Sequence, residues 1–291
     1  MSPLVGIVTH PHRGVEIAAR AARTLGAAGA EVRIPAPDAA MSELAPLAGL
    51  VAHTSPAEKF AAGLDFAVSV GGDGTMLRTV DMVGDEGVPV LGVHVGHVGF
   101  LNEIEPADLE NALGRVLAGD YEISERMVLS VEVASAGPAS GTWLALNEAV
   151  LEKVSSGHLV RLEVSINGKL FSTYSADGII VATPTGSTAY NFSARGPIVS
   201  PRHRCLLLTP VSPHMLFNHP LVLSPDETLD FTVAGQQSAV GLILDGREVG
   251  ELAEGDRVTC TAGPRPARLI TFQPRDFHQV LKAKFGLPGA G

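Results

Sequence analysis

The stretch FAVSVGGDGT, residues 66–75, is the clearest indication of how the N-terminal part of the chain folds. Residues 66–70 form a short apolar run, which is typical of a strand buried in a parallel sheet. Residues 75–83 have the spacing of a helix. Three glycines occupy the four positions 71–74 between them, and glycine permits both positive φ and close approach to the backbone. The stretch therefore predicts a strand, a tight loop and a helix in succession.

Strand-like and helix-like runs alternate on both sides of this unit. We expect further strands at residues 3–9, 31–34 and 88–93, and helices at residues 14–29 and 106–118. Such alternation is the pattern of a doubly wound α/β domain with a parallel sheet. We expect this domain to span residues 1–122 and to contain the GGDGT loop.

After about residue 120, strand-like runs follow one another without long helices between them. Asn167-Gly168, between two such runs, is a strong hairpin signal. These runs predict a β-sandwich-like domain over residues 123–272. The tail returns to helical spacing at 275–285, and we expect residues 273–291 to form a helical tail that packs back on the first domain. The predicted strands of the second domain are residues 126–134, 142–151, 159–166, 178–182, 206–208, 229–233, 239–244, 257–261 and 267–272.

Composition excludes several classes of protein. The 291 residues include 21 Lys and Arg against 31 Asp and Glu, a net charge of −10. Proteins that bind nucleic-acid duplexes usually carry a basic stripe, because phosphate neutralisation dominates their affinity, so we expect no nucleic-acid partner. With 45% hydrophobic and 18% charged residues, the chain is not intrinsically disordered. Cys205 and Cys260 lie far apart in the sequence, which predicts neither a disulfide framework nor a structural zinc site.

The N-terminus lacks the basic and apolar regions of a secretory signal. No stretch approaches the roughly 18 apolar residues of a membrane span. We therefore expect a cytoplasmic protein that does not bind a membrane.

The GGDGT loop has the properties of a phosphate site. Successive backbone N–H groups there can form an anion-binding nest, and the helix N-terminus adds positive potential. The carboxylate of Asp73 repels a phosphate. A carboxylate at this position is therefore expected either to bind a metal ion or to remove a proton. The alternative is a tight turn in which Asp73 caps the helix. The loop is neither a Walker A motif nor a GxGxxG fingerprint.

Residues 175–190, SADGIIVATPTGSTAY, form a second motif. A strand is followed by a loop dense in hydroxyl groups, which suit a polyhydroxyl ligand because each hydroxyl both donates and accepts hydrogen bonds. The alternative is a solvent-exposed Ser/Thr-rich turn. The segment lacks a GxSxG elbow, so Ser187 is not expected to be an acyl-transfer nucleophile.

Asn147-Glu148 interrupts a strand-like apolar run, ALNEAV. In a regular strand the two side chains lie on opposite faces, so both can serve one ligand only at a strand end or a bulge. An Asn amide matches the N6/N7 edge of adenine, and Glu accepts hydrogen bonds from sugar hydroxyls. The alternative is an ordinary turn at a strand end.

Taken together and in this order, the three motifs resemble the NAD kinase family. That family has a GGDGT loop, an Asn-Glu pair, and Asp-Gly followed by TPTGSTAY and GPI; here residues 183–199 read TPTGSTAYNFSARGPIV. Residues 90–103, VLGVHVGHVGFLNE, are similar to a further segment of the family. A lipid kinase is an alternative, because diacylglycerol kinases share GGDGT, but it does not explain TPTGSTAY. A dinucleotide sensor without turnover is expected to lack the carboxylate of Asp73.

The resemblance implies transfer of the terminal phosphoryl group of ATP or polyphosphate to the 2′-hydroxyl of the adenosine ribose of NAD, which gives NADP. It implies that Asp73 is the general base and that Mg²⁺ or another divalent ion accompanies the donor. It further implies an active site between an α/β domain and a β-sandwich, and a homodimer or homotetramer.

The resemblance also implies the roles of single residues. Gly71, Gly72 and Gly74 contact phosphates with help from Arg78. Adenine lies against Asn147, Tyr190 and Ser193, and a ribose against Glu148. Asp177 and Ala189 meet the nicotinamide end, Thr188 lines the pocket, and His158 occupies a position that is often basic. Further nucleotide-binding residues are Thr75, Phe100, Thr185 and Asp245, and no residue is implied to ligate a metal.

Three positions depart from the family pattern. His94 replaces a frequent Asn, and Arg247 replaces a frequent Gln. Ser175 replaces a basic residue of some relatives, which leaves the choice between NAD and NADH open. The histidines His10, His12, His203 and His278 are interpreted as ordinary surface or core residues.

Overall fold

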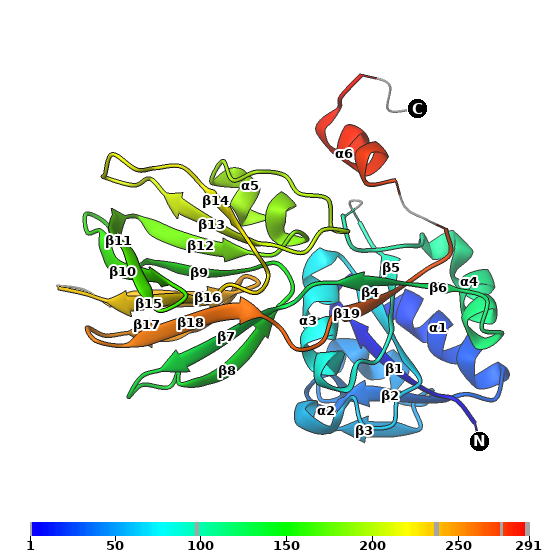
Figure 1. Ribbon diagram of the computed structural model, residues 1–291. Helices are drawn as coiled ribbons and strands as arrows, with labels where there is room; N and C mark the ends of the chain where they lie inside the picture. The colour runs from blue at the N-terminus through cyan, green and yellow to red at the C-terminus, as the bar shows by residue number, and fades with distance from the viewer. Residues whose placement is uncertain (1, 97–98, 236–238, 274–275, 289–291) are drawn as a thin grey trace. The chain divides into compact units, whose positions relative to one another are not determined.

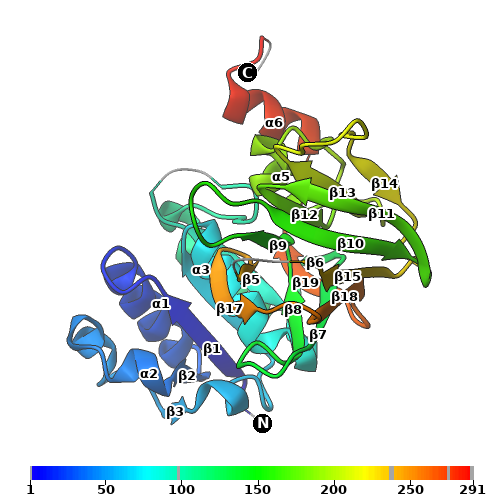
Figure 2. The ribbon, with the colours of Figure 1, turned by 90° about the vertical axis from the view of Figure 1, so that its left-hand side faces the viewer.

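The computed structural model describes residues 2–96, 99–235, 239–273 and 276–288. The chain forms two compact units (Figures 1 and 2). Unit 1 consists of Met1–Glu125 with Ala267–Gly291, and unit 2 of Arg126–Pro266. The chain thus leaves unit 1 after its first 125 residues and returns to it for the last segment.

Unit 1 is built on a seven-stranded sheet with the order β3-β2-β1-β4-β5-β19-β6. From β3 to β19, neighbouring strands pair in parallel. All six residues of β4 are buried, as expected for a strand covered on both faces. The doubly wound α/β prediction is confirmed. The strands are β1 (Leu4–Thr9), β2 (Glu31–Pro35), β3 (His53–Ser55), β4 (Phe66–Gly71), β5 (Val90–His94), β6 (Glu122–Arg126) and β19 (Ala267–Thr271).

Helices cover both faces of this sheet. The core on one face joins strand residues such as Val68 to Leu25 of α1 and Leu113 of α4, whereas α3 lies on the other side of the strands (Figure 1). The short helices α2 and η1 to η4 fill the connections. The helical elements are α1 (Val15–Ala27), α2 (Ala36–Ala39), α3 (Asp73–Val83), α4 (Leu109–Leu117), α6 (Phe277–Phe285), η1 (Ser42–Leu47), η2 (Ala57–Lys59), η3 (Gly84–Glu86) and η4 (Pro106–Asp108).

Strand β19 differs from its sequence-based assignment. The sequence pattern predicts that residues 267–272 belong to the β-rich domain, but β19 pairs in parallel with β5, with Leu269 opposite Val90. An apolar run of this length suits a buried strand of either sheet. The pattern therefore does not reveal which partner it pairs with.

The last helix is fixed at its start by its own sequence. The side chain of Asp276 accepts hydrogen bonds from the amides of His278 (2.9 Å) and Gln279 (3.4 Å), which is an N-cap. Near its end, the ring of Phe285 lies 6.5 Å from that of Phe100. Arg275, where the helical pattern begins in the sequence, lies outside the described residues.

Unit 2 is a β-sandwich of two six-stranded antiparallel sheets. Their strand orders are β11-β10-β15-β18-β7-β8 and β14-β13-β12-β9-β16-β17. One apolar core joins both sheets, for example Leu129 of β7 and Leu242 of β16, so the sandwich-like prediction is confirmed. The strands are β7 (Leu129–Ala134), β8 (Gly141–Ala145), β9 (Glu148–Lys153), β10 (Val160–Ile166), β11 (Lys169–Ala176), β12 (Gly178–Ala182), β13 (Leu206–Val211), β14 (Leu221–Leu223), β15 (Leu229–Val233), β16 (Val240–Leu244), β17 (Arg247–Leu252) and β18 (Arg257–Ala262).

Two turns of unit 2 bear on the sequence predictions. Asn167 and Gly168 have φ of 52° and 73° and connect β10 to β11 as a two-residue hairpin loop, which confirms the hairpin signal. The run 142–151, in contrast, is not one strand. It divides into β8 and β9 around Leu146 and Asn147, because the side chain of Asp245, from another hairpin, binds the backbone there.

In the part of the chain that the structure describes, no helix is long and apolar enough to cross a membrane.

Candidate active site

The GGDGT loop joins β4 to α3 as predicted. Gly72 is the N-cap residue and α3 begins at Asp73. The first amide groups of an α-helix have no partner within the helix, and the helix dipole adds positive potential at this end. The loop therefore presents backbone donors at the carboxyl end of β4, where ligands bind in open α/β sheets.

Asp73 does not cap α3, so the alternative of a simple capped turn is wrong. Its Oδ2 accepts a hydrogen bond from the amide of Phe100 (2.8 Å). Its Oδ1 accepts from the amide of Leu101 (3.3 Å) and from Nδ2 of Asn102 (3.2 Å). A Cβ at Gly99 would overlap the carboxylate, so only glycine lets this segment lie so close. The segment 99–102 thus fixes the orientation of the carboxylate.

A cavity of about 420 Å³ lies at the GGDGT loop. It brings together Gly71, Gly72, Gly74 and Arg78, to which the family resemblance gives contacts with phosphates, and Thr75, which it implies binds nucleotide. The rest of its lining comes from Val95, from Thr9 at the end of β1, and from the loop between β1 and α1. Arg78 forms an ion pair with Asp38 of α2.

Two lining residues were not predicted. The sequence alone suggests an ordinary histidine at position 10 and gives no role to Arg13, yet both line the cavity. They lie there because β1 and β4 are parallel neighbours, with Thr9 opposite Val70. The loops that follow these two strands therefore lie side by side. The sequence does place an imidazole and a guanidinium group directly after a predicted strand. To assign these groups to the phosphate site, however, one has to know that this strand lies next to β4.

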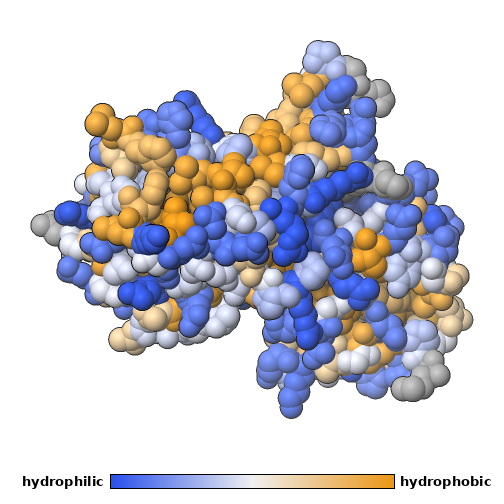
Figure 3. Space-filling model, viewed as in Figure 1, coloured by the Kyte–Doolittle hydropathy of each residue, from blue (hydrophilic) through white to orange (hydrophobic). Residues whose placement is uncertain are grey.

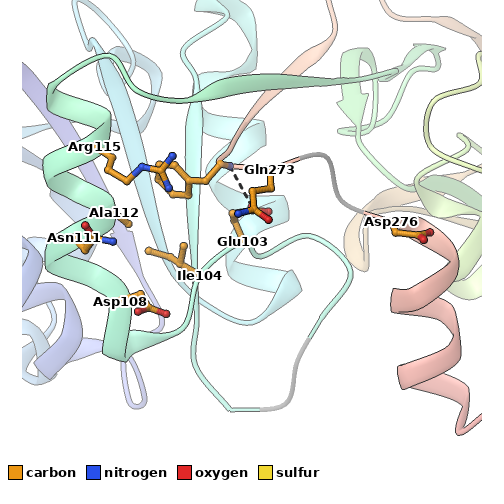
Figure 4. Close-up of a pocket in the computed structure, with 9 residues that line it drawn as sticks. Glu103, Ile104, Asp108, Asn111, Ala112, Arg115, Gln273 and Asp276 are labelled. Atoms are coloured by element: carbon orange, nitrogen blue, oxygen red, sulfur yellow. Dashed lines mark hydrogen bonds between the residues drawn. The ribbon is translucent and has the colours of Figure 1, made fainter. Parts of the chain in front are cut away.

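A second cavity of unit 1, of about 400 Å³, is lined by residues that include Glu103, Asp108 and Arg115, and Asp276 at the start of α6 (Figure 4). Arg115 stacks on the ring of Phe272, 4.4 Å from its centroid. Three carboxylates against one guanidinium do not suit a phosphate. None of the residues predicted for the site lines this cavity.

In unit 2, the Asn147-Glu148 pair stands at a strand end, the position that lets both side chains serve one ligand. Asp245 sets this bend. Its Oδ2 accepts a hydrogen bond from the amide of Leu146 (2.7 Å), and its Oδ1 accepts from the amides of Asn147 (2.8 Å) and Glu148 (3.0 Å). The family resemblance implies that Asp245 binds nucleotide; in the structure both of its oxygens bind backbone amides.

Asp245 lies in the tight turn between β16 and β17, and this turn directs its side chain to the backbone at Asn147. Asp245 and Gly246 have φ of 50° and 77°, and Leu244 pairs with Arg247 on either side of them. This is the two-residue hairpin geometry that favours Asp-Gly. The turn places the carboxylate at the start of β9, the neighbour of β16 in the sheet.

Glu148 is buried, with 6% of its surface exposed. The pKa of Glu148 is raised from 4.5 to about 8, mainly by burial and secondly by the charge of Asp245. A hydrogen bond with the backbone of Tyr190 opposes this shift. Among the described residues, its Oε2 has no hydrogen-bond partner. Without a ligand, Glu148 is therefore largely protonated at neutral pH, and its carboxyl group can donate as well as accept.

The TPTGSTAY segment packs against the same bend. The amide of Thr183 donates to the Asn147 carbonyl (2.8 Å), and its hydroxyl donates to the Leu146 carbonyl (2.6 Å). Ser187 is fully buried and bonds to the backbone of Val199. These two hydroxyls stabilise the loop itself. The segment continues through η5 (Gly186–Thr188) into α5 (Tyr190–Ser193).

The other predicted residues of unit 2 lie on the segment that contains TPTGSTAY, before it at Asp177, or on the loop that contains His158. Thr185 is buried, and its carbonyl accepts a hydrogen bond from the hydroxyl of Thr188 (3.3 Å). Ala189 and Ser193 bound the short helix α5, and Tyr190 is 39% exposed. Asp177 forms an ion pair with Lys153. Burial raises the pKa of Tyr190, and the charges of Glu152 and then of Asp177 raise it further. His158 lies on the exposed loop between β9 and β10 and takes no part in these contacts.

The two halves of the chain match the two domains of one enzyme family. Residues 5–121 match the ATP-NAD kinase N-terminal domain and residues 146–272 the ATP-NAD kinase C-terminal domain. The NAD kinase of Thermobifida fusca (strain YX) is 41% identical over 295 residues, which cover 96% of this chain and 89% of the relative. The NAD kinase of Heliobacterium modesticaldum is 39% identical over 285 residues, which cover 97% and 98%.

Solved structures share the fold. The crystal structure of yeast NADH kinase complexed with NADH aligns with a TM-score of 0.89 at 24% identity, over 100% of this chain and 89% of that one. The crystal structure of an NAD kinase from Archaeoglobus fulgidus in complex with ATP aligns with a TM-score of 0.73 at 25% identity, over 98% and 100%. On the sequence matches of both domains, the chain belongs to the NAD kinase family of phosphotransferases.

Proposed function

We propose that the chain transfers the terminal phosphoryl group of ATP or inorganic polyphosphate to the 2′-hydroxyl of the adenosine ribose of NAD, with Asp73 as general base. In this step the bond between the ribose oxygen and phosphorus forms, and the bond from that phosphorus to the bridging oxygen of the donor breaks. The hydroxyl proton passes to Asp73. The observation that supports the proposal is the fixed carboxylate of Asp73, which stands in the chain between Gly72 and Gly74, two of the residues that line the cavity.

The hydrogen bonds of Asp73 favour one of its oxygens as the base. Oδ1 accepts two hydrogen bonds, whereas Oδ2 accepts one, from the amide of Phe100. A carboxylate oxygen offers about two acceptor sites, so Oδ2 retains one for the ribose hydroxyl. A loose phosphoryl-transfer transition state lets the proton leave late, so orientation matters more than base strength.

Unit 2 supplies the groups for the dinucleotide in this proposal. Asn147 binds the adenine edge, with Tyr190 and Ser193 beside it, and the protonated carboxyl of Glu148 binds a ribose hydroxyl as donor and acceptor. Asp177, Ala189, Thr185, Thr188 and His158 remain proposed contacts. Bound NADH and bound ATP in the two solved relatives support a dinucleotide and a nucleotide as the ligand classes.

The family implies Mg²⁺ or another divalent ion with the donor. Among the described residues, no three His, Cys, Asp or Glu side chains are grouped so that they could hold a metal. Mg²⁺ is commonly bound by one or two carboxylates together with substrate phosphates. The residues therefore do not form a protein cage for the ion, and we propose that it enters the site on the phosphates of the donor.

We further propose that the chain assembles into a homodimer or homotetramer. Exposed apolar side chains of unit 2 gather around β11, β13 and β14 (orange in Figure 3). They include Leu170, Phe171, Leu216, Phe217 and Val222, and the rings of Phe171 and Phe217 lie 5.7 Å apart. Large exposed apolar patches are typical of interaction surfaces. Light scattering coupled to gel filtration measures the number of subunits.

One assay tests the activity and both open preferences. The purified protein is incubated with NAD or NADH and with ATP or polyphosphate, each with Mg²⁺, and an NADP-specific dehydrogenase detects the product. We expect product with at least one pair of substrates. Absence of product with every pair, or phosphorylation of diacylglycerol instead, contradicts the proposed function.

A further inference from the structure

We propose that the loop between β1 and α1 is part of the phosphate-donor site, and that His10 and Arg13 bind the linear polyphosphate of the donor together with the glycine loop. This inference rests on the proposed function for the identity of the donor. The ligand class is a linear polyphosphate, whose source is ATP or inorganic polyphosphate.

The loop between β1 and α1 is attached to the end of β4, directly before Gly71. The amide of His10 donates to the carbonyl of Val70 (2.9 Å), and the hydroxyl of Thr9 also donates to it (3.3 Å). A Cβ at Gly14 would overlap Thr9 and crowd the same carbonyl. The sequence therefore brings this loop next to the glycine loop by close backbone packing, and both loops line the 420 Å³ cavity.

The hydrogen bonds of His10 define which ring nitrogen can donate. Its Nδ1 accepts from the amides of His12 (3.2 Å) and Arg13 (3.3 Å). A ring nitrogen that accepts carries no proton, so the neutral ring carries its proton on Nε2. His10 therefore offers one N–H donor from Nε2, while Nδ1 maintains the shape of the loop.

Two guanidinium groups add positive charge to the cavity. Arg13 is exposed to solvent, and Arg78 is held by the carboxylate of Asp38, which is 1% exposed. A guanidinium group has five N–H donors, so this pair leaves Arg78 donors to spare. Among the described residues that line the cavity, none is acidic. In a chain with a net charge of −10, this local composition indicates an anion.

The two cavities of unit 1 differ in the charge of their lining. The two cavities are similar in size, about 420 and 400 Å³. Glu103, Asp108 and Asp276 line the second cavity, whereas two arginines, an imidazole and glycine backbone line the first. Charge and donor content, rather than volume, therefore distinguish the polyphosphate site.

The test compares Arg13→Gln and His10→Asn with Arg23→Gln, an exposed arginine on α1. Asn at position 10 keeps an acceptor for the loop amides but does not reach the position of Nε2. With Mg²⁺ present, the donor is varied at saturating NAD, in one arm with ATP and in the other with inorganic polyphosphate, and NAD is varied at saturating donor. Binding of tripolyphosphate alone is measured by calorimetry, which does not require turnover.

We expect Arg13→Gln and His10→Asn each to raise the KM of either donor by about tenfold or more, the usual effect of losing a hydrogen bond to a charged group. The KM of NAD is expected to stay unchanged, tripolyphosphate affinity to fall by a similar factor, and Arg23→Gln to resemble the wild type. Arg13→Lys should restore part of the affinity because it retains the charge.

Unchanged donor KM and tripolyphosphate affinity in both variants overturn the inference while the proposed function stands. An effect on the KM of ATP without any fall in tripolyphosphate affinity also overturns it, since the loop then recognises the nucleoside. A wild-type protein that phosphorylates neither NAD nor NADH overturns the proposed function, and the calorimetry still decides whether the loop binds a polyphosphate.

Discussion

The side chain of Asn102 donates a hydrogen bond from Nδ2 to Oδ1 of Asp73 across 3.2 Å, although the two residues lie 29 positions apart in the sequence. Asn102 is 2% exposed. Together with the amides of Phe100 and Leu101, it fixes the plane of the carboxylate. Asn102 is thus a positioning residue for the proposed base.

Asn102→Ala is expected to lower kcat by about tenfold, the effect of a lost hydrogen bond to a charged group. The KM of NAD should stay within about twofold, because the contacts proposed for adenine and for Glu148 lie in unit 2 and do not involve Asn102. Steady-state kinetics and a melting curve separate misorientation from unfolding. Asn111→Ala, at an exposed position on α4, is the control. An unchanged kcat in Asn102→Ala contradicts the positioning role.

Asp245→Ala is expected to raise the KM of NAD by about tenfold or more, because the bend at Asn147 and Glu148 loses an acceptor for three amides. Asn167→Ala is a matched control. Asn167 has φ of 52° against 50° for Asp245, so both variants place alanine in the same strained conformation, at a cost of about 1 kcal/mol or more. Kinetics that are equal in the two variants would show that Asp245 stabilises only its own turn.

Glu148 is expected to make the stability of unit 2 depend on pH. Its pKa is about 8 in the folded chain and 4.5 for the ordinary group. Between these values the folded chain retains a proton that the unfolded chain has released, so the free energy of unfolding falls as the pH rises from about 4.5 to about 8. Glu148→Gln, which imitates the protonated form, should make this dependence shallower.

Urea unfolding at several pH values measures this dependence. Glu163→Gln, at an exposed position of β10, is the control and should retain the slope of the wild type. If Glu148→Gln retains that slope as well, Glu148 is ionised at neutral pH and binds the ribose only as an acceptor.

The sequence predicts features that depend on neighbouring residues. The strand, loop and helix around GGDGT follow from apolar runs and glycines within 20 residues, and the Asn167-Gly168 hairpin from a two-residue preference. The sequence does not decide whether the strand ends at Asn147 or continues through it. The strand ends there because of the carboxylate of Asp245, about a hundred residues further along the chain.

Features that depend on distant pairing were not predicted. Strand β19 has an ordinary apolar pattern, and only its pairing with β5 places it in unit 1. His10 and Arg13 reach the cavity because β1 and β4 are neighbours. For Asp73, the sequence indicates a functional carboxylate. It does not reveal the groups that orient this carboxylate, because Phe100 and Asn102 lie in a different loop.

The turnover of Asp73→Asn, measured together with the dinucleotide affinity of the same protein, tests whether Asp73 is the general base. Asp81→Asn, an exposed position on the same helix, is the control. We expect phosphorylation of NAD to fall by about a hundredfold or more, in line with the loss of a general base, while calorimetry shows NAD bound as in the wild type. Full turnover by Asp73→Asn would contradict the assignment of Asp73 as the base.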